Sequence, residues 1–240
     1  MTATKLDHIA LGLPRASDAI ELFEERLGGA PAGGYDGEGA PFGFRQWEFQ
    51  GGGRLEVIYP SGPPNGFMHR FLAAGGPRVH HVTLKVASLD ETLAKAAAHG
   101  QQVIGVERSN PHWQEAFLHP KQAQGIVVQM VEQAPGGEGD DLLPASRPRA
   151  DGARLVGLRL FARSAEAARR QWSDLLGGSA AMQGSSLVFR WEQSPLVLLV
   201  DVRPDAAEGP QQNELRATRD LILPRGPYPG LGTRFVQTGR

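Results

Sequence analysis

The chain contains no cysteine among its 240 residues. Disulfide bonds and thiolate metal sites are therefore excluded, and this composition fits a reducing cytoplasm. Charge of either sign is not in excess, since the net charge is −1, so no basic surface predicts a nucleic-acid or anionic membrane partner. No apolar run is long enough to cross a bilayer, and the start of the chain, MTATKLDH, lacks the apolar stretch of a signal peptide. We therefore expect a cytoplasmic protein with a small-molecule substrate and with neither a membrane nor a nucleic-acid partner.

The most informative pattern is a repeat with a constant offset. His8 and His81 are 73 residues apart, and Glu56 and Gln129 are separated by the same interval. The sequences around the two histidines, LDHIALGL and VHHVTLKV, also match. Each copy thus places a histidine on its first strand and a glutamate or glutamine on its last. Four such side chains, related by a pseudo-twofold axis, could surround one divalent metal ion.

Strand periodicity predicts where these side chains point. In both first strands the histidine alternates with apolar residues. Because successive side chains of a strand point to opposite sides, the apolar rows should pack on a helix while His8 and His81 face the other surface of the sheet. His80 is out of phase with His8 and is predicted to point to the helix side. Glu56 lies in an otherwise apolar strand and should have a partner, because an unpaired buried charge is costly.

Each copy reads as a strand, then a helix, then further strands. In the first copy the helix is predicted over residues 17–27, and a glycine-rich loop over residues 33–43 precedes two strands. In the second copy Ser88 and Glu91 form a capping box that opens the helix. These units are the modules of a duplicated domain.

A third copy follows a linker rich in glycine, proline and acidic residues. Its first strand, LVGLRLFA, aligns with LDHIALGL at an offset of 149. Gly157 takes the place of His8 and Val200 that of Glu56, so this copy is predicted to be degenerate and to hold no metal. It needs another surface to cover its core, either the paired modules or a second subunit. The chain thus divides into three parts. Residues 1–134 form a domain of two modules, at 1–76 and 77–134. Residues 135–152 form a linker, and residues 153–240 form the third module.

These motifs resemble the vicinal oxygen chelate superfamily, which includes glyoxalase I, bleomycin resistance proteins, extradiol dioxygenases and methylmalonyl-CoA epimerase. The similarity is closest to the epimerase-like proteins and covers residues 5 to about 133. It rests on four motifs: LDH at 6–8, LEVIYP at 55–60, VHHV at 79–82 and FLHPK at 117–121. The resemblance implies an α+β fold in which paired β-α-β-β-β modules form a curved mixed sheet around a metal cleft. We also expect a homodimer.

The resemblance implies a metal centre and a reaction class. The ligands would be His8, Glu56, His81 and Gln129, and their nitrogen and oxygen donors suit Zn, Ni, Co, Mn or Fe. The metal would polarise a small carbonyl or acyl substrate and stabilise an enolate, as in an isomerase or a lyase. Glu56 is the candidate base, and Gln129 stands at the second catalytic position. The residues expected to contact substrate are Gln46, Trp113, His119 and Lys121.

The sequence departs from the epimerase pattern at two amides. Gln129, and by a less secure alignment Gln46, stand where epimerases have carboxylates. A neutral amide can bind metal through its oxygen but cannot accept a proton near neutral pH, so two-base epimerisation is not expected. Three alternatives stay open: a non-catalytic small-molecule binding or resistance protein, an Fe-dependent extradiol-type dioxygenase, and a structural or subunit role for the same fold.

Overall fold

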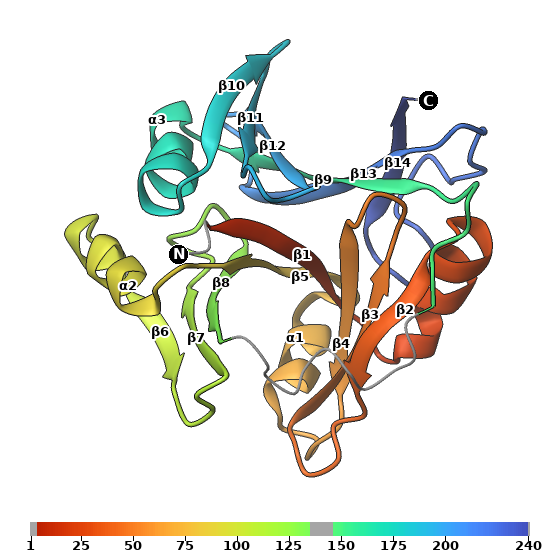
Figure 1. Ribbon diagram of the computed structural model, residues 1–240, viewed down its shortest axis with the longest axis horizontal. Helices are drawn as coiled ribbons and strands as arrows, with labels where there is room; N and C mark the ends of the chain where they lie inside the picture. The colour runs from red at the N-terminus through yellow and green to blue at the C-terminus, as the bar shows by residue number, and fades with distance from the viewer. Residues whose placement is uncertain (1–3, 135–145, 240) are drawn as a thin grey trace. The chain divides into compact units, whose positions relative to one another are not determined.

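The computed structural model describes residues 4–134 and 146–239. Its strands form two mixed sheets, one of eight strands and one of six, and the helices are few and short (Figure 1). This architecture confirms the α+β class predicted from the sequence. Much of the predicted linker, residues 135–145, lies outside the described residues.

The eight-stranded sheet consists of two modules of the same design. The strands of the first module are β1 (Lys5–Gly12), β2 (Ala30–Tyr35), β3 (Phe42–Glu48) and β4 (Arg54–Pro60), and those of the second are β5 (Arg78–Lys85), β6 (Val103–Glu107), β7 (Trp113–Leu118) and β8 (Val127–Gln133). Their order across the sheet is β2-β3-β4-β1-β5-β8-β7-β6. Counted outward from the centre, the two modules therefore contribute their strands in the same succession, as the sequence repeat predicts.

The glycine-rich loop predicted over residues 33–43 is wrong in part, because β2 continues into it as far as Tyr35. β2 pairs antiparallel with β3, and Gly34 lies opposite Arg45. A Cβ atom on Gly34 would lie 2.6 Å from Cδ of Arg45, so only glycine leaves room for that side chain. The glycines of β2 therefore lie in a strand that pairs with its neighbour, while Gly37 and Gly39 lie in the connection between β2 and β3, as predicted.

Helices of the paired modules are η1 (Ala16–Ala19), η2 (Glu21–Arg26), α1 (Phe67–Gly75) and α2 (Leu89–Ala98). The regular helix predicted over residues 17–27 is replaced by a 3₁₀ turn followed by a π-helical turn, in which the backbone N–H of Leu27 donates to the carbonyl of Leu22 at 2.9 Å. α2 begins at the predicted cap, where the Glu91 backbone N–H donates to Ser88 Oγ.

The six-stranded sheet repeats the design of the first module and adds two strands. Its elements are β9 (Arg154–Ala162), α3 (Ala165–Arg169), η3 (Arg170–Leu175), β10 (Ser179–Gln183), β11 (Ser186–Arg190), β12 (Val197–Val202), β13 (Gly209–Arg216) and β14 (Arg234–Gly239). In the order β10-β11-β12-β9-β13-β14, the first four strands match β2-β3-β4-β1. β13 and β14 pair in parallel, as β5 and β8 do. The last part of the chain thus resembles a shortened fourth module.

The π-helical turn recurs in the third module. In η3 the backbone N–H of Leu176 donates to the carbonyl of Gln171 at 3.2 Å, five residues earlier. Phe23 of η2 and Trp172 of η3 occupy the same position in the repeat, and both side chains are fully buried. The repeated placement of a large aromatic residue on this turn indicates that the turn serves core packing in both modules.

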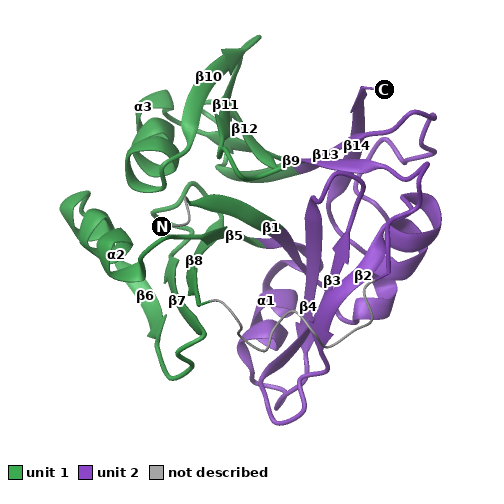
Figure 2. Cartoon of the chain, viewed as in Figure 1, with its two compact units in different colours: residues 1–8, 81–137, 157–211 green, residues 9–80, 138–156, 212–240 purple. Residues whose placement is uncertain are grey.

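The chain forms two compact units, each of which takes strands from both sheets (Figure 2). The first unit comprises residues 1–8, 81–137 and 157–211, and the second comprises residues 9–80, 138–156 and 212–240. In the first unit Trp172 Nε1 donates to Gln124 Oε1 at 3.0 Å. In the second unit the ring of Phe23 lies 5.8 Å from that of Phe49 and 6.0 Å from that of Phe235. Within each unit, residues of the third module therefore pack against residues of the paired modules.

The helices found in the described part of the chain are all too short or too polar to cross a lipid bilayer.

Candidate metal centre

Two histidines of the first unit lie close together on neighbouring strands. His8 of β1 is 1% exposed and His81 of β5 is 5% exposed, so both imidazoles are buried. Their ring centroids are 5.8 Å apart, with an angle of 71° between the planes. Burial and proximity of two imidazoles are the first requirements for a shared metal ion.

A carboxylate orients the His8 ring. His8 Nδ1 lies 3.0 Å from Asp7 Oδ2, and the other oxygen of Asp7 forms ion pairs with Lys5 and Lys85 at 3.3 and 3.2 Å. Burial alone would raise the pKa of the Asp7 carboxyl, but the hydrogen bond with His8 and the charges of His8, Lys85 and Lys5 outweigh it and hold this pKa well below its usual range. The ionised Asp7 fixes the ring through Nδ1 and leaves Nε2 directed toward the site.

A chain of hydrogen bonds continues from His8 across three strands. The Thr83 hydroxyl lies 2.9 Å from His8 Nε2 and donates to Gln129 Oε1 at 2.5 Å. Gln129 Nε2 donates to Glu115 Oε2 at 2.7 Å, and the Trp113 indole N–H donates to the same oxygen at 2.8 Å. Strand register explains the alignment, because Thr83 is the Cα partner of Gln129 and Gln129 that of Phe117, two residues from Glu115.

In the second unit Glu56 lies on β4 opposite Gln46 of β3. Glu56 is 7% exposed, and Gln46 Nε2 donates to its Oε2 at 2.8 Å. The buried Glu56 carboxylate therefore has the hydrogen-bond partner that was predicted for a charge in an apolar strand. His80 belongs to the same unit but lies on the helix side, where its ring is 4.6 Å from that of Phe71 in α1. Burial, opposed by a smaller effect of Glu56, lowers the pKa of His80 to about 4.

His8, Glu56 and His81 are a candidate ligand group for a metal ion, and all three are buried. Two imidazole nitrogens and one carboxylate oxygen suit divalent Zn, Mn, Fe, Co or Ni. The carboxylate that holds His8 by its other nitrogen is typical of metal-binding histidines. The donor set therefore fits the metal that the sequence predicts.

Comparison with known proteins agrees with this geometry. Residues 7–117 match the family described as the Glyoxalase/Bleomycin resistance protein/Dioxygenase superfamily. This segment of the chain is similar to that superfamily. The match includes His8, Glu56 and His81 and ends before Gln129. No curated protein matches the chain.

Several solved structures resemble the chain at low sequence identity. A mutant of 4-hydroxymandelate synthase from Streptomyces coelicolor is 13% identical, with a TM-score of 0.63, over 91% of this chain and 72% of that one. A hypothetical protein from Bacillus halodurans C-125 is 24% identical, with a TM-score of 0.51, over 57% and 99%. Methylmalonyl-CoA epimerase from Mycobacterium tuberculosis is 22% identical, with a TM-score of 0.49, over 56% and 94%. The first two show a shared fold, and the synthase shares it over nearly the whole chain.

The residues predicted to contact substrate fall into separate places. Gln46 lies against Glu56. Trp113 is the first residue of β7, and its ring lies 5.8 Å from Lys85 Nζ. His119 and Lys121 lie in the turn after β7, at the end of the strand opposite to Trp113, and Lys121 is exposed. Of the three predicted residues on or after β7, Trp113 alone is linked, through Glu115, to the hydrogen-bonded row that includes His8.

Sequence reasoning missed three residues of this hydrogen-bonded row: Asp7, Thr83 and Glu115. Asp7 neighbours His8 in the chain, and strand alternation points the two side chains apart, so their contact is unexpected. Thr83 is two residues from His81 and therefore shares its face, a signal that the sequence did contain. Glu115 could have been found from an alternation of Trp113, Glu115 and Phe117, but only with the register between β7 and β8 known.

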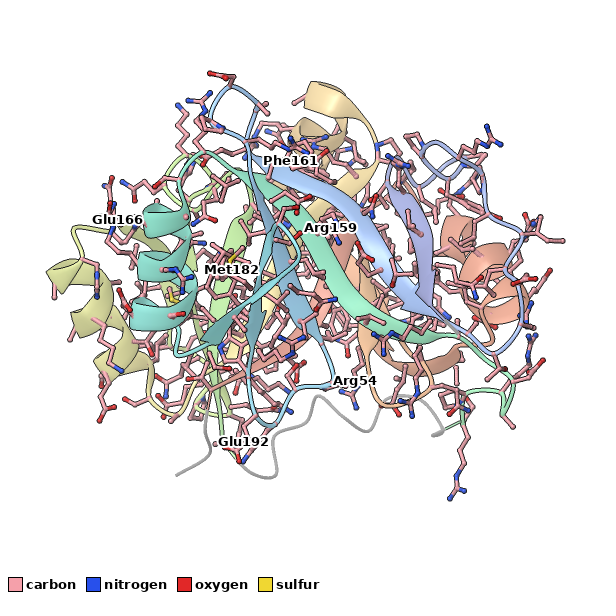
Figure 3. The ribbon with its side chains drawn as sticks, turned by 90° about the horizontal axis from the view of Figure 1, so that it is seen from above. Arg54, Arg159, Phe161, Glu166, Met182 and Glu192 are labelled. Carbon is pink, nitrogen blue, oxygen red and sulfur yellow. The ribbon has the colours of Figure 1, made fainter. Side chains whose placement is uncertain are left out.

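The corresponding face of the third module carries an ion pair. A Cβ atom on Gly157 would lie 1.9 Å from the carbonyl oxygen of Val197, so no side chain fits at the position equivalent to His8. Two residues on, Arg159 Nη1 donates to Asp201 Oδ1 at 2.8 Å and to Ser186 Oγ at 3.0 Å. Figure 3 shows Arg159 on β9 with Phe161 beyond it. This chemistry differs from that of a superfamily metal site.

Proposed function

We propose that this protein is a metal-dependent enzyme of the glyoxalase superfamily that acts as an isomerase or lyase on a small carbonyl or acyl substrate. The observation that carries the proposal is the buried pair His8 and His81, with Asp7 holding His8 by Nδ1. A metal ion at His8 Nε2 would take the place of the Thr83 hydroxyl that contacts this nitrogen. A carboxylate on the other ring nitrogen is typical of metal-binding histidines.

In this proposal His8, His81 and Glu56 hold the ion. A bound divalent metal supplies Lewis acidity, which polarises a substrate carbonyl and stabilises negative charge on its oxygen. Gln129 can join as a fourth ligand through Oε1 only by exchanging its hydrogen bond from Thr83. Otherwise its amide acts as a positioning group, since it ties Thr83 to Glu115.

Proton transfer in this proposal falls to two carboxylates. Glu56 is the base expected from the sequence. Glu115 is the second, because it lies on the same hydrogen-bonded row as His8 and its orientation is fixed by donors from Gln129 and Trp113. A carboxylate beside Gln129 supplies the proton acceptor that the amide itself cannot be.

The test is loss of the α-proton from small carbonyl and acyl compounds in D₂O, followed by NMR with the metal-loaded protein. We expect exchange that falls about 100-fold or more in Glu115→Gln, because general base catalysis contributes about that factor. Glu107→Gln, at an exposed position on β6, is the matched control and should exchange like the wild type. If no compound exchanges, or if both variants exchange like the wild type, the proposed reaction class or the role of Glu115 is wrong.

One observation supports a second candidate. Two histidines and one carboxylate are also the ligand set of non-haem Fe(II) oxygenases. Oxygen consumption by the Fe(II)-loaded protein with catechol-type substrates tests this function. Uptake that depends on both Fe(II) and substrate would favour the oxygenase over the isomerase or lyase.

A further inference from the structure

Helix α1 covers part of the face of β3 and β4 that carries Glu56, which we call the Glu56 face. Alternation along β4 places Glu56, Ile58 and Pro60 on this face, and Phe42 of β3 shares it as the partner of Pro60. The ring of Phe67 in α1 lies 5.4 Å from that of Phe42. The first turn of α1 therefore rests on the Glu56 face, and Figure 2 shows the helix beside β4.

A second contact places α1 on the same face one strand further on. The Leu13 backbone N–H donates to the Ile58 carbonyl at 3.0 Å, which brings β1 alongside β4 with Gly12 next to Ile58. A Cβ atom on Gly12 would collide with the ring of Phe71, so only glycine lets α1 approach β1 this closely. Phe67 and Phe71 lie one helical turn apart, and both rest on the Glu56 face.

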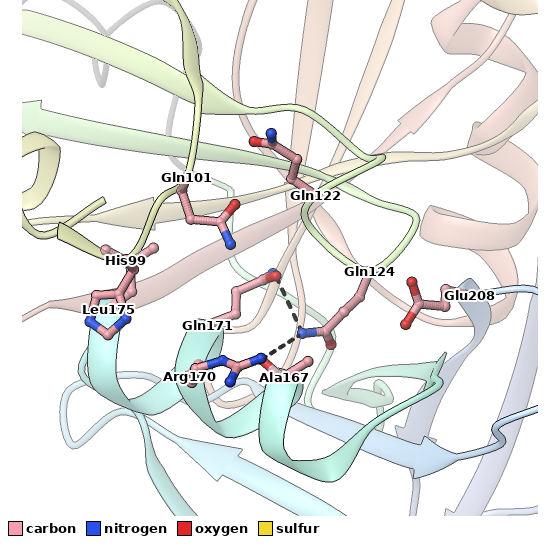
Figure 4. A pocket seen from close by; sticks show the side chains of 9 residues that line it. All are labelled: His99, Gln101, Gln122, Gln124, Ala167, Arg170, Gln171, Leu175 and Glu208. Carbon is pink, nitrogen blue, oxygen red and sulfur yellow. Dashed lines mark hydrogen bonds between the residues drawn. The ribbon is translucent and has the colours of Figure 1, made fainter. Parts of the chain in front are cut away.

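Residues on the Glu56 face are closed to solvent. Glu56 is 7% exposed and Ile58 is 3% exposed. The pocket at the end of α2 does not open this face, because its described lining, which includes Gln122 and Gln171, contains none of the candidate metal ligands (Figure 4). A substrate can therefore reach the Glu56 carboxylate only when an element that covers the face moves.

The build of α1 is that of an element that can move. Of its nine residues only Met68 is buried, and Phe67 and Phe71 are half-buried. Its N-cap, Gly66, provides no side-chain hydrogen bond, and the helix is flanked by the glycine- and proline-rich sequences SGPPNG at 61–66 and GGP at 75–77. A short helix held by few buried side chains opens locally at a lower cost in free energy than the strands beneath it.

We propose that α1 is a lid on the Glu56 face, which swings out on its glycine- and proline-rich flanks to admit substrate. In the closed state Phe67 and Phe71 lie over the face and exclude water from Glu56. In the open state the carboxylate is accessible to a small molecule. The proposal rests on the proposed function in one respect, which is that substrate binds on this face.

The experiment uses the absence of cysteine, which allows one thiol to report on one position. Ile58→Cys places the thiol on the Glu56 face, and Val57→Cys, at a fully buried neighbour on the opposite face, is the matched control. The metal-free variants are labelled with N-ethylmaleimide and followed by mass spectrometry. We expect Ile58→Cys to react about tenfold or more faster than Val57→Cys, because opening of α1 costs less than unfolding. Its rate should change little with low concentrations of urea, whereas that of Val57→Cys should rise steeply.

A second pair of variants assigns the opening to α1. Phe67→Ala removes the contact with Phe42 and should speed labelling of Ile58→Cys about tenfold. Phe161→Ala is the matched control, since Phe161 is also a half-buried phenylalanine, and it should leave that rate unchanged. Glu56→Cys, on the same face, repeats the measurement if Ile58→Cys does not fold.

Two results would overturn the proposal. If the thiols at positions 57 and 58 react at equal rates with equal urea dependence, the Glu56 face opens only when the protein unfolds, and α1 is fixed. If Phe161→Ala speeds labelling as much as Phe67→Ala, the effect is general destabilisation and not release of α1. Neither measurement needs metal or substrate, so failure of the lid is distinguishable from failure of the proposed function.

Discussion

Thr83→Val tests the hydrogen-bonded row at its centre. Thr83 is fully buried, and its hydroxyl joins His8 Nε2 to Gln129 Oε1. Valine keeps the β-branched shape and the strand preference, so the substitution removes little besides the hydroxyl. Gln129 is 9% exposed, and its oxygen would then be buried without its donor. We expect a loss of about 1–3 kcal/mol in the free energy of unfolding, measured by urea denaturation of the metal-free protein.

Thr92→Val is the matched control for this prediction. Thr92 is also buried, and its hydroxyl donates to the carbonyl of Ser88 at 2.7 Å. That carbonyl keeps a second donor, the Thr92 backbone N–H at 3.2 Å, so no polar atom loses its last partner. The control should cost no more than about 0.5 kcal/mol. Equal losses in the two variants would refute the reasoning, because they would show that the Gln129 oxygen does not depend on Thr83.

Three further predictions concern Gly157, Asp7 and Gln129. Gly157→Ala should destabilise the protein by about 1–3 kcal/mol or more, because its Cβ would meet the Val197 carbonyl; an unchanged melting temperature would contradict this. Asp7→Asn should weaken metal binding about 10–100-fold in a chelator competition, since the ring of its histidine partner loses a charged acceptor; an unaltered affinity would argue against a ligand role. Gln129→Glu should lower the melting temperature of the metal-free protein, because the new carboxylate would repel that of Glu115. A bound metal ion should restore the melting temperature. A metal-free variant as stable as the wild type would exclude this repulsion.

The repeat makes part of the fold predictable. The offset of 73 residues marks both modules, and strand alternation alone distinguishes His81 from its neighbour His80. These predictions depend only on the spacing of residues along the chain, and this spacing does not depend on tertiary contacts. The helix predicted at residues 17–27 is right in place but not in type, because a π-helical turn differs from an α-helix in hydrogen bonding that the sequence does not display.

Some strands and contacts could not be predicted from the sequence, for physical reasons. β10, with sequence SAAMQ, is short and mostly exposed, and β13, with sequence GPQQNELR, is largely polar, so neither shows the apolar alternation that marks a strand. Contacts between strands are equally hidden. Glu115 reaches Gln129 only because of the register between β7 and β8, which is set by the fold and not by local sequence.

Metal content of two adjacent histidine variants tests the central claim most directly. The measurement is metal stoichiometry of the purified wild type, His81→Gln and His80→Gln after loading with Zn, Mn, Fe, Co or Ni. Because His81 lies beside His8 while His80 packs on Phe71, we predict about one ion per chain in the wild type and in His80→Gln, and loss of the ion in His81→Gln. Retention of the ion in His81→Gln with its loss in His80→Gln, or a wild type that binds none of these metals, would contradict the account.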